Sequence, residues 1–176
     1  MPVLSATTIG VIGSGRDAHE DLARELGALL AHLGVNLLTG AGGGVMTSVS
    51  QAFTQAARTT GVSIGIIPCK SERDRSPKAG YPNEFIELSI YTHLPYSGDL
   101  GRHDLSRNHI IVLSSAAIIA LPGEAGTASE VDLALQYHKP IVVYSHDHAS
   151  VKQFSPDAPR VSSLGEVRAF LYALRA

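Results

Sequence analysis

The sequence predicts an α/β fold with a doubly wound, mainly parallel sheet and helices on both of its faces. Three observations support this prediction. Apolar runs of strand length alternate with helical patterns along most of the chain. Runs such as 62–67 are largely apolar, as in parallel strands that are covered on both faces. Two strands end in glycine-rich corners that lead into helices, which is typical of Rossmann-like folds.

The first half of the chain contains three expected strands and two expected helices. Leucines recur at helical spacing between Leu22 and Leu33, so the first helix is expected at 18–33. A second helix is expected to begin near Val45 and Met46. The strands are expected at 7–13, 35–39 and 62–67.

Residues 68–83 interrupt this alternation. They are rich in proline, glycine and charged residues and show no apolar periodicity, so we expect a long exposed loop, which in compact domains is often functional. The remaining pattern predicts further strands and helices in alternation. They are a strand at 85–91, a loop at 95–99, a helix at 105–114, a strand at 117–121, a helix ending near 137, a strand at 141–144, loop or a short helix at 145–159, an edge pairing at Val161 and a helix at 165–176.

Length and composition bound the function. The 176 residues are enough for one well-filled core and few for two, so 1–176 is expected to form a single Rossmann-like domain. A net charge of -2 and a pI near 6.4 argue against a general affinity for nucleic acid or anionic membranes. The single cysteine, Cys69, excludes an internal disulfide. With no apolar run near the roughly 20 residues that cross a bilayer and no secretory leader, we expect a cytoplasmic protein.

The most informative segment is the corner at 121–130, where an apolar strand turns into a helix. Pro122, Gly123 and Gly126 shape this turn, and Thr127 adds a hydroxyl. A helix N-terminus presents unpaired N–H groups and a partial positive charge, so this corner is expected to hold a phosphate. On that interpretation, a β-branched residue at Gly126 should abolish ligand binding and leave the fold largely intact.

A second glycine-rich corner lies upstream at 40–44, between an expected strand and an expected helix. Gly40, Gly42, Gly43 and Gly44 indicate unusual dihedral angles and a ligand close to bare backbone, and Met46 follows in the helix. The alternative is a tight turn with no ligand. Two such corners in one short chain favour binding.

A third turn follows the first expected strand. Gly13 and Ser14, with Gly15, form half of a dinucleotide fingerprint, because the third glycine is missing. Ser14 could donate its hydroxyl to a ligand and Arg16 could offer its charge. Capping of the first helix is an equally good explanation of these residues.

Three polar residues flank the corner at 121–130. Glu130 lies in the first turns of the following helix, where a carboxylate could contact a ribose or act as a base. Arg107 and Asn108 precede the same strand, and a guanidinium there could pair with a phosphate. A solvated helix residue is an equally good interpretation of Arg107. Metal binding is not expected, because His146 and His148 alternate as in a loop rather than forming a helical chelate.

These segments resemble a known superfamily, once labelled lysine decarboxylase-like, which includes the cytokinin-activating phosphoribohydrolases. The similar segments are GAGGGVM at 40–46, the Arg107-Asn108 pair before a strand, and PGEAGTASE at 122–130. The resemblance implies a nucleoside monophosphate held by glycine corners, with Arg107 and Glu130 cleaving the base from the ribose. Asn108 replaces a lysine of the hydrolase pattern and Glu124 replaces a glycine, so the hydrolase stays an alternative.

The sequence more closely resembles the molybdenum cofactor carrier proteins of this superfamily. The similar segments are the Arg-Asn pair, GYPN at 80–83 and THLP at 92–95. This resemblance implies a cytoplasmic homotetramer that binds and protects molybdenum cofactor (molybdopterin), a pterin with a phosphate tail, for transfer to molybdoenzymes, without catalysis and without a protein-ligated metal. Basic loop residues could complement the oxyanionic metal end, although a run of loop charges is usually only solvated; they are Lys70, Arg73, Arg75, Lys78, Arg102 and His103.

Overall fold

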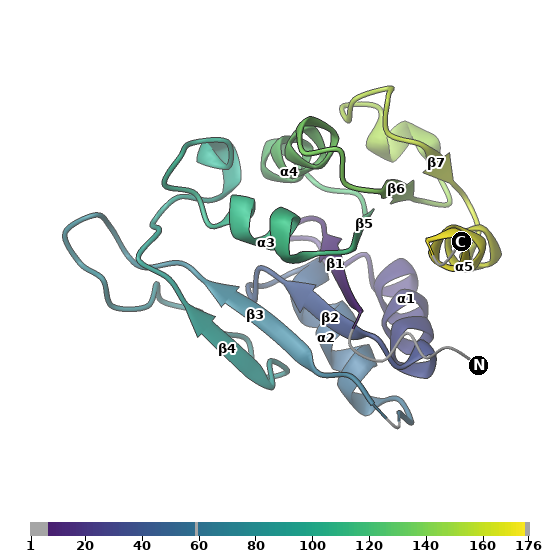
Figure 1. Ribbon diagram of the computed structural model, residues 1–176, viewed down its shortest axis with the longest axis horizontal. Helices are drawn as coiled ribbons and strands as arrows, with labels where there is room; N and C mark the ends of the chain where they lie inside the picture. The colour runs from purple at the N-terminus through teal and green to yellow at the C-terminus, as the bar shows by residue number, and fades with distance from the viewer. Residues whose placement is uncertain (1–6, 59, 175–176) are drawn as a thin grey trace.

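A parallel sheet forms the centre of the computed structural model, which describes residues 7–58 and 60–174 (Figure 1). Within these residues the sheet has seven strands in the order β4-β3-β2-β1-β5-β6-β7. The strands are β1 (Thr8–Ile12), β2 (Asn36–Thr39), β3 (Ser63–Ile67), β4 (Leu88–Tyr91), β5 (Ala117–Ala120), β6 (Ile141–Tyr144) and β7 (Arg160–Val161). Because the strand order reverses at β1, the sheet is doubly wound, and the predicted α/β Rossmann-like fold is confirmed.

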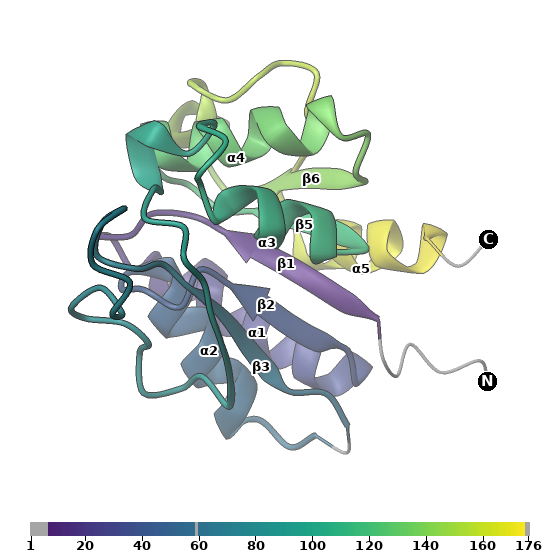
Figure 2. The same cartoon turned by 60° about the vertical axis from the view of Figure 1, so that its left-hand side comes forward.

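Helices cover both faces of the sheet. Figure 2 shows α3 and α4 on one side of the strands and α1 and α2 on the other. The helices are α1 (Glu20–Leu33), α2 (Val45–Gln55), α3 (Asn108–Ser114), α4 (Ala125–Gln136) and α5 (Leu164–Ala173), with two short 3-10 turns, η1 (Gly98–Leu100) and η2 (His148–Val151). One apolar core joins the sheet to α1, α2 and α5, and a second joins it to α3 and α4.

The central strands are buried because helices pack on each side of them. Every residue of β5 and β6 is buried, and both strands consist entirely of apolar or aromatic residues. On one face, Leu26 and Leu30 of α1 join Phe53 of α2 in the core. Since burying one large apolar side chain contributes roughly 1.5–3 kcal/mol, these layers hold the carboxyl ends of the strands in fixed positions.

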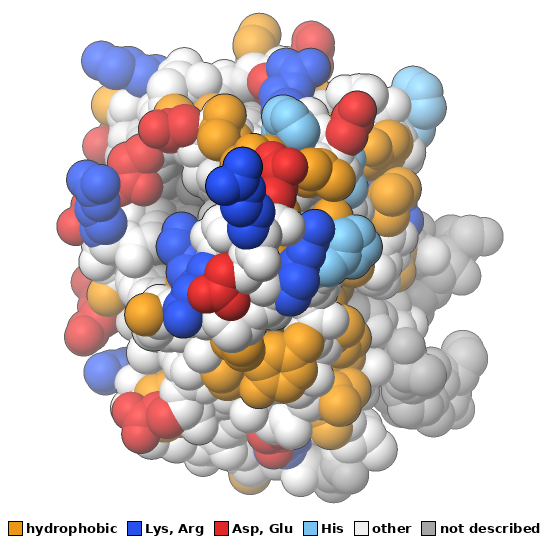
Figure 3. Space-filling view, turned by 90° about the vertical axis from the view of Figure 1, so that its left-hand side faces the viewer, with side chains coloured by type: hydrophobic (Ala, Val, Ile, Leu, Met, Phe, Trp, Pro, Cys, Tyr) orange, Lys and Arg blue, Asp and Glu red, His pale blue; other side chains and the backbone are white. Residues whose placement is uncertain are grey.

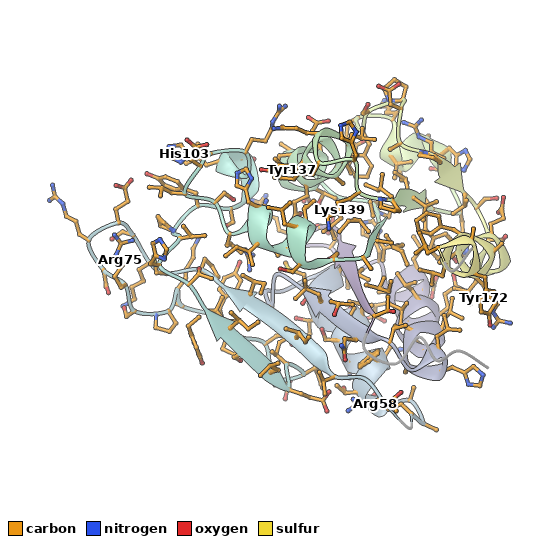
Figure 4. The ribbon with its side chains drawn as sticks, viewed as in Figure 1. Arg58, Arg75, His103, Tyr137, Lys139 and Tyr172 are labelled. Carbon is orange, nitrogen blue, oxygen red and sulfur yellow. The ribbon has the colours of Figure 1, made fainter. Side chains whose placement is uncertain are left out.

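Two predicted elements begin later than their sequence patterns indicate. Helix α3 begins at Asn108 rather than near 105, because Tyr96 binds the preceding segment: its N–H donates to the Leu105 carbonyl, and its own carbonyl accepts from the Arg107 N–H. Strand β4 begins at Leu88 because Asn83 folds the segment before it into a turn, accepting from the N–H of Phe85. Glu87, directly before β4, forms an ion pair with Arg58, which follows α2 and is labelled in Figure 4.

The C-terminal helix also differs slightly from its predicted bounds. It begins at Leu164 behind a capping box, in which Ser163 and Glu166 bond each other's backbone N–H groups. The described helix ends at Ala173, and residues 175–176 of the predicted range lie outside the described residues. The predicted edge pairing at Val161 is confirmed by its register with Tyr144 of β6.

Candidate functional site: a cleft at the carboxyl ends of the strands

A cleft with a volume of about 510 Å³ lies beyond the carboxyl ends of the strands. The loops after β1, β2 and β5 meet there, on both sides of the point where the strand order reverses. Eight of the predicted site residues line the cleft: Gly13, Gly40, Met46, Arg107, Asn108, Gly126, Thr127 and Glu130. The other six lie in the supporting turns: Ser14, Gly42, Gly43, Gly44, Pro122 and Gly123.

The corner between β5 and α4 opens directly into the cleft. Helix α4 begins at Ala125, and the side chain of its N-cap residue, Glu124, makes no capping hydrogen bond to the first turn. Among the described residues, no acceptor bonds the N–H groups of Ala125, Gly126 and Thr127. These three donors and the positive end of the helix dipole can therefore bind an anion.

Gly126 has a different role from the predicted one. A Cβ atom at this position would lie 2.8 Å from the Cα atom of Gly98, in the wall formed by η1. The missing side chain therefore makes room for the protein's own backbone, so substitution of Gly126 is expected to displace this wall as well as affect a ligand. The prediction that such a variant leaves the fold largely intact therefore does not extend to the η1 wall.

The corner between β2 and α2 is mostly filled by the protein. A Cβ atom at Gly44, whose φ is 59°, would lie 2.4 Å from the Ser14 carbonyl oxygen. At Gly40 it would lie 2.6 Å from a guanidinium nitrogen of Arg107. The carbonyl of Gly42 accepts hydrogen bonds from the side chains of Thr47 and Asn83. Most of these glycines therefore allow three loops to pack closely, and only Gly40 lines the cleft.

Ser14 connects the three loops. Its N–H donates to the Pro122 carbonyl, and its carbonyl accepts from the Val45 N–H. The buried hydroxyl accepts from the backbone N–H groups of Arg16 and Asp17 and donates to Oε1 of Glu124 at 2.8 Å. Because a hydroxyl has one proton, Ser14 has none left for a ligand. The expected hydroxyl contact from Ser14 is thus replaced by a contact with Glu124.

Arg107 is buried, with only 4% of its surface exposed. Its guanidinium donates to the carbonyls of Gly40 and Ile66 and lies 5.3 Å from the centre of the Tyr81 ring. Burial lowers the pKa of Arg107, and the nearby Tyr81 and Glu130 oppose this effect. The Nε atom has no hydrogen-bond partner among the described residues. Arg107 is therefore a structural cation at the cleft rather than a solvated helix residue.

Glu130 lies at the cleft on the second turn of α4, close enough to Arg107 for electrostatic interaction. Desolvation raises the pKa of Glu130 to about 7, and Arg107 partly offsets this rise. Near neutral pH the carboxyl group is therefore divided between its charged and neutral forms, which suits a proton donor, a proton acceptor or a hydrogen-bonding partner for a base.

Sequence reasoning missed one aromatic residue and one wall of the cleft. Tyr81 lines the cleft, although the GYPN segment was noted only as a similarity. Ser97, Gly98 and Asp99 form the opposite wall, next to the first turn of α4. The glycine at 98, with φ of 60°, lay in an expected loop and could have suggested a close approach.

The basic loop residues do not reach the cleft. None of Lys70, Arg73, Arg75, Lys78, Arg102 and His103 lines it within the described part of the chain. Lys70 pairs with Asp74, and Arg102 pairs with Asp132. Figure 3 shows acidic and basic side chains intermixed over this end of the molecule, and Figure 4 places Arg75 and His103 on separate loops there. These loops therefore carry a mixture of acidic and basic side chains rather than a basic surface that faces the metal end of the cofactor.

Two further searches concern metals and membranes. Across residues 7–58 and 60–174, no three His, Cys, Asp or Glu side chains lie in an arrangement that could hold a metal ion. The described helices include none that combines the length and the apolar character needed to cross a bilayer.

Fold and cleft together define a parallel α/β protein with a candidate anion site at the switch point of its sheet. The chain belongs to the SLOG cluster4 family, whose sequence profile matches residues 6–169. It is also 35% identical over 134 residues to an uncharacterized protein of Archaeoglobus fulgidus, covering 74% of this chain and 75% of the relative.

Solved structures agree with this membership. The molybdenum cofactor binding protein from the phototrophic bacterium Rippkaea orientalis superposes with a TM-score of 0.73 at 33% identity, over 97% of this chain and 98% of that one. The Moco carrier protein of Chlamydomonas reinhardtii superposes with a TM-score of 0.71 at 27% identity, over the same shares of the two chains. The resemblance to molybdenum cofactor carrier proteins is confirmed.

Proposed function

We propose that this protein binds molybdenum cofactor, a pterin with a phosphate tail, and stores and protects it in the cytoplasm without transforming it. The observation that carries the proposal is the start of α4, where no described residue bonds the first three N–H groups and where Gly126 and Thr127 line a cleft of about 510 Å³. Clefts of this size enclose small organic ligands, and a helix N-terminus favours a phosphate. Two solved relatives that bind or carry this cofactor support the choice of cargo.

The other side chains of the cleft complement a pterin. Tyr81 offers an aromatic ring on which a flat heterocycle can stack. Glu130 can accept hydrogen bonds from ring N–H groups when it is charged and donate one when it is neutral. The proposal retains those predicted binding residues that line the cleft and adds Tyr81; they are Gly13, Gly40, Met46, Arg107, Asn108, Gly126, Thr127 and Glu130. The cargo would then pass to molybdoenzymes, and nucleic acid is not a proposed partner.

The phosphoribohydrolase is a second candidate, favoured by one observation. A carboxyl group with a pKa of about 7 beside a buried arginine is a suitable general acid or base for cleaving an N-glycosidic bond. Against it, the Arg107 guanidinium already donates to two backbone carbonyls, so much of its hydrogen-bonding capacity is used by the protein.

One pair of assays separates the two candidates. Mixed anaerobically with molybdenum cofactor, the purified protein should bind it stoichiometrically and slow its decay in air. Decay as fast as with an unrelated protein of equal concentration rejects the carrier. In a panel of nucleoside monophosphates, release of free base that Glu130→Ala abolishes would establish the hydrolase instead.

We also propose that the protein is a homo-oligomer, in agreement with the expected tetramer, and that β4 contributes to its interface. This edge strand exposes Leu88, Ile90 and Tyr91 at 49%, 43% and 61%, and β3 is its only neighbour in the described sheet. Exposed apolar edge strands usually pair or are covered. Light scattering after size-exclusion chromatography should give a mass near that of four chains. The Ile90→Lys variant should have a lower mass. A wild-type protein that is monomeric would contradict the proposed oligomer.

A further inference from the structure

Glu124 occupies the mouth of the anion site, at a position where the similar hydrolase motif has glycine. It is the N-cap residue of α4, its side chain is exposed, and it lines the cleft beside Gly126 and Thr127. Ser14 donates a hydrogen bond to Oε1, whereas Oε2 has no partner among the described residues. The corner therefore offers both N–H donors and a free acceptor oxygen.

Ser14 fixes the position of this carboxylate. The Ser14 side chain is fully buried, and its oxygen accepts two backbone N–H groups from the turn after β1. Its only proton is directed to Glu124 as a result. A carboxylate held in this way cannot turn away from the corner without leaving a buried hydroxyl proton unpaired, which is unfavourable.

The other charged groups at the cleft do not cancel this negative charge. Arg16 and Arg107 are cationic, and Asp99, Glu124 and Glu130 are acidic. The Arg107 guanidinium lines the cleft and donates to two backbone carbonyls, and its buried Nε atom lacks a partner among the described residues. A dianion at the start of α4 would thus meet favourable N–H groups and a nearby fixed carboxylate.

We propose that Glu124 makes the α4 corner selective for a singly charged phosphate. A hydrogen phosphate accepts from the N–H groups of α4 through its charged oxygens and donates its own proton to Oε2 of Glu124. A dianionic monoester lacks this proton and is repelled by the carboxylate. The inference rests on the proposed function, because it assigns the ionisation state in which the phosphate tail is bound.

Two pterin probes test this selectivity by calorimetry: pterin-6-ylmethyl phosphate, which changes from monoanion to dianion near pH 6, and its methyl phosphodiester, which stays a monoanion. Neither contains an N-glycosidic bond, so neither is a hydrolase substrate. Ionisation of Glu130 in this pH range also acts on both probes, so the change in their affinity ratio is compared between the wild type and a Glu124 variant that keeps Glu130.

For the wild type, the affinity ratio of monoester to diester should fall about fivefold as the pH rises from about 5.5 to about 8. In Glu124→Gln, which keeps an acceptor for Ser14, the ratio should stay flat or rise. The control Glu84→Gln removes an exposed carboxylate outside the cleft and should behave like the wild type.

The outcomes are decisive. A wild-type ratio that does not change with pH, or a ratio that falls equally in Glu124→Gln, overturns the role of Glu124 and leaves the proposed carrier function standing. Absence of binding by either probe to any variant at any pH overturns the proposed function, and this inference with it.

Discussion

The two glycine-rich corners look alike in sequence and differ in the structure. At 40–44 the glycines admit other parts of the protein: Ser14 packs against Gly44, and Arg107 packs against Gly40. At 122–127 the helix begins with three N–H groups that no described residue bonds, and two of the residues that carry them, Gly126 and Thr127, line the cleft. Glycine content therefore shows where backbones come close, whereas unpaired donors show where a ligand can bind.

The difference has a physical cause. The corner at 40–44 lies between the turn after β1 and the GYPN segment, and the backbone N–H and side chain of Asn83 donate to the carbonyls of Ala41 and Gly42. It is enclosed from both sides. The corner after β5 is contacted by Ser14, by the η1 turn and by Gln153, whose side chain donates to the Gly123 carbonyl, and Gly126 and Thr127 still line the cleft.

The largest expected effect is on stability at the first corner. Gly44→Ala places a Cβ atom against the Ser14 carbonyl in a backbone conformation that L residues rarely adopt, so we expect a loss of about 2–4 kcal/mol. Urea unfolding measures this loss. Gly43→Ala is the matched control, since its Cβ atom would lie 3.2 Å from the Gly15 carbonyl oxygen, and its cost should stay below about 1 kcal/mol. Equal losses would contradict the packing role of Gly44.

A smaller, pH-dependent effect is expected at the second corner. Because burial raises the pKa of Glu130 from 4.5 to about 7, the folded state holds a proton that the unfolded state releases, and wild-type stability falls as the pH rises across that range. Glu130→Gln should therefore be more stable than the wild type by about 1–2 kcal/mol near pH 8, with little advantage near pH 4. Urea unfolding at both pH values tests this, and a constant difference between them argues against a buried carboxyl group.

The smallest expected effect is on ligand affinity alone. Thr127→Val removes a hydroxyl at the cleft and keeps the side-chain shape, so affinity for the pterin phosphate probe should fall about three- to tenfold, as for one lost hydrogen bond. Calorimetry measures the affinity and urea unfolding the stability. Thr54→Val, on α2 outside the cleft, should leave the affinity unchanged. Full affinity in Thr127→Val would place the ligand elsewhere.

The sequence predicted the fold well because most strands lie in largely apolar runs, such as β5 and β6, and helices such as α1 carry a clear periodicity. Regular elements such as α1 and β6 depend on local patterns, and their observed bounds lie within about two residues of the expected ones. The later starts of α3 and β4 were not predictable in this way. They result from contacts of Tyr96 and Asn83 with segments whose positions depend on the folded sheet.

The candidate site was predictable only in outline. Arg107, Asn108 and Glu130 lie at one cleft, as their positions beside a single strand indicated. The destination of a hydroxyl proton is a three-dimensional property, so the sequence could not show that Ser14 bonds Glu124, 110 positions away. The same holds for Tyr81, which reaches the cleft because its segment folds over the corner at 40–44.

A crystal structure with bound molybdenum cofactor is the most direct test of the central claim, that the two corners have different roles. We expect the phosphate oxygens to lie about 3 Å from the backbone nitrogens of Gly126 and Thr127, at the start of α4. A phosphate bound instead to the backbone of 42–44, with the N–H groups of α4 left to solvent, would contradict it.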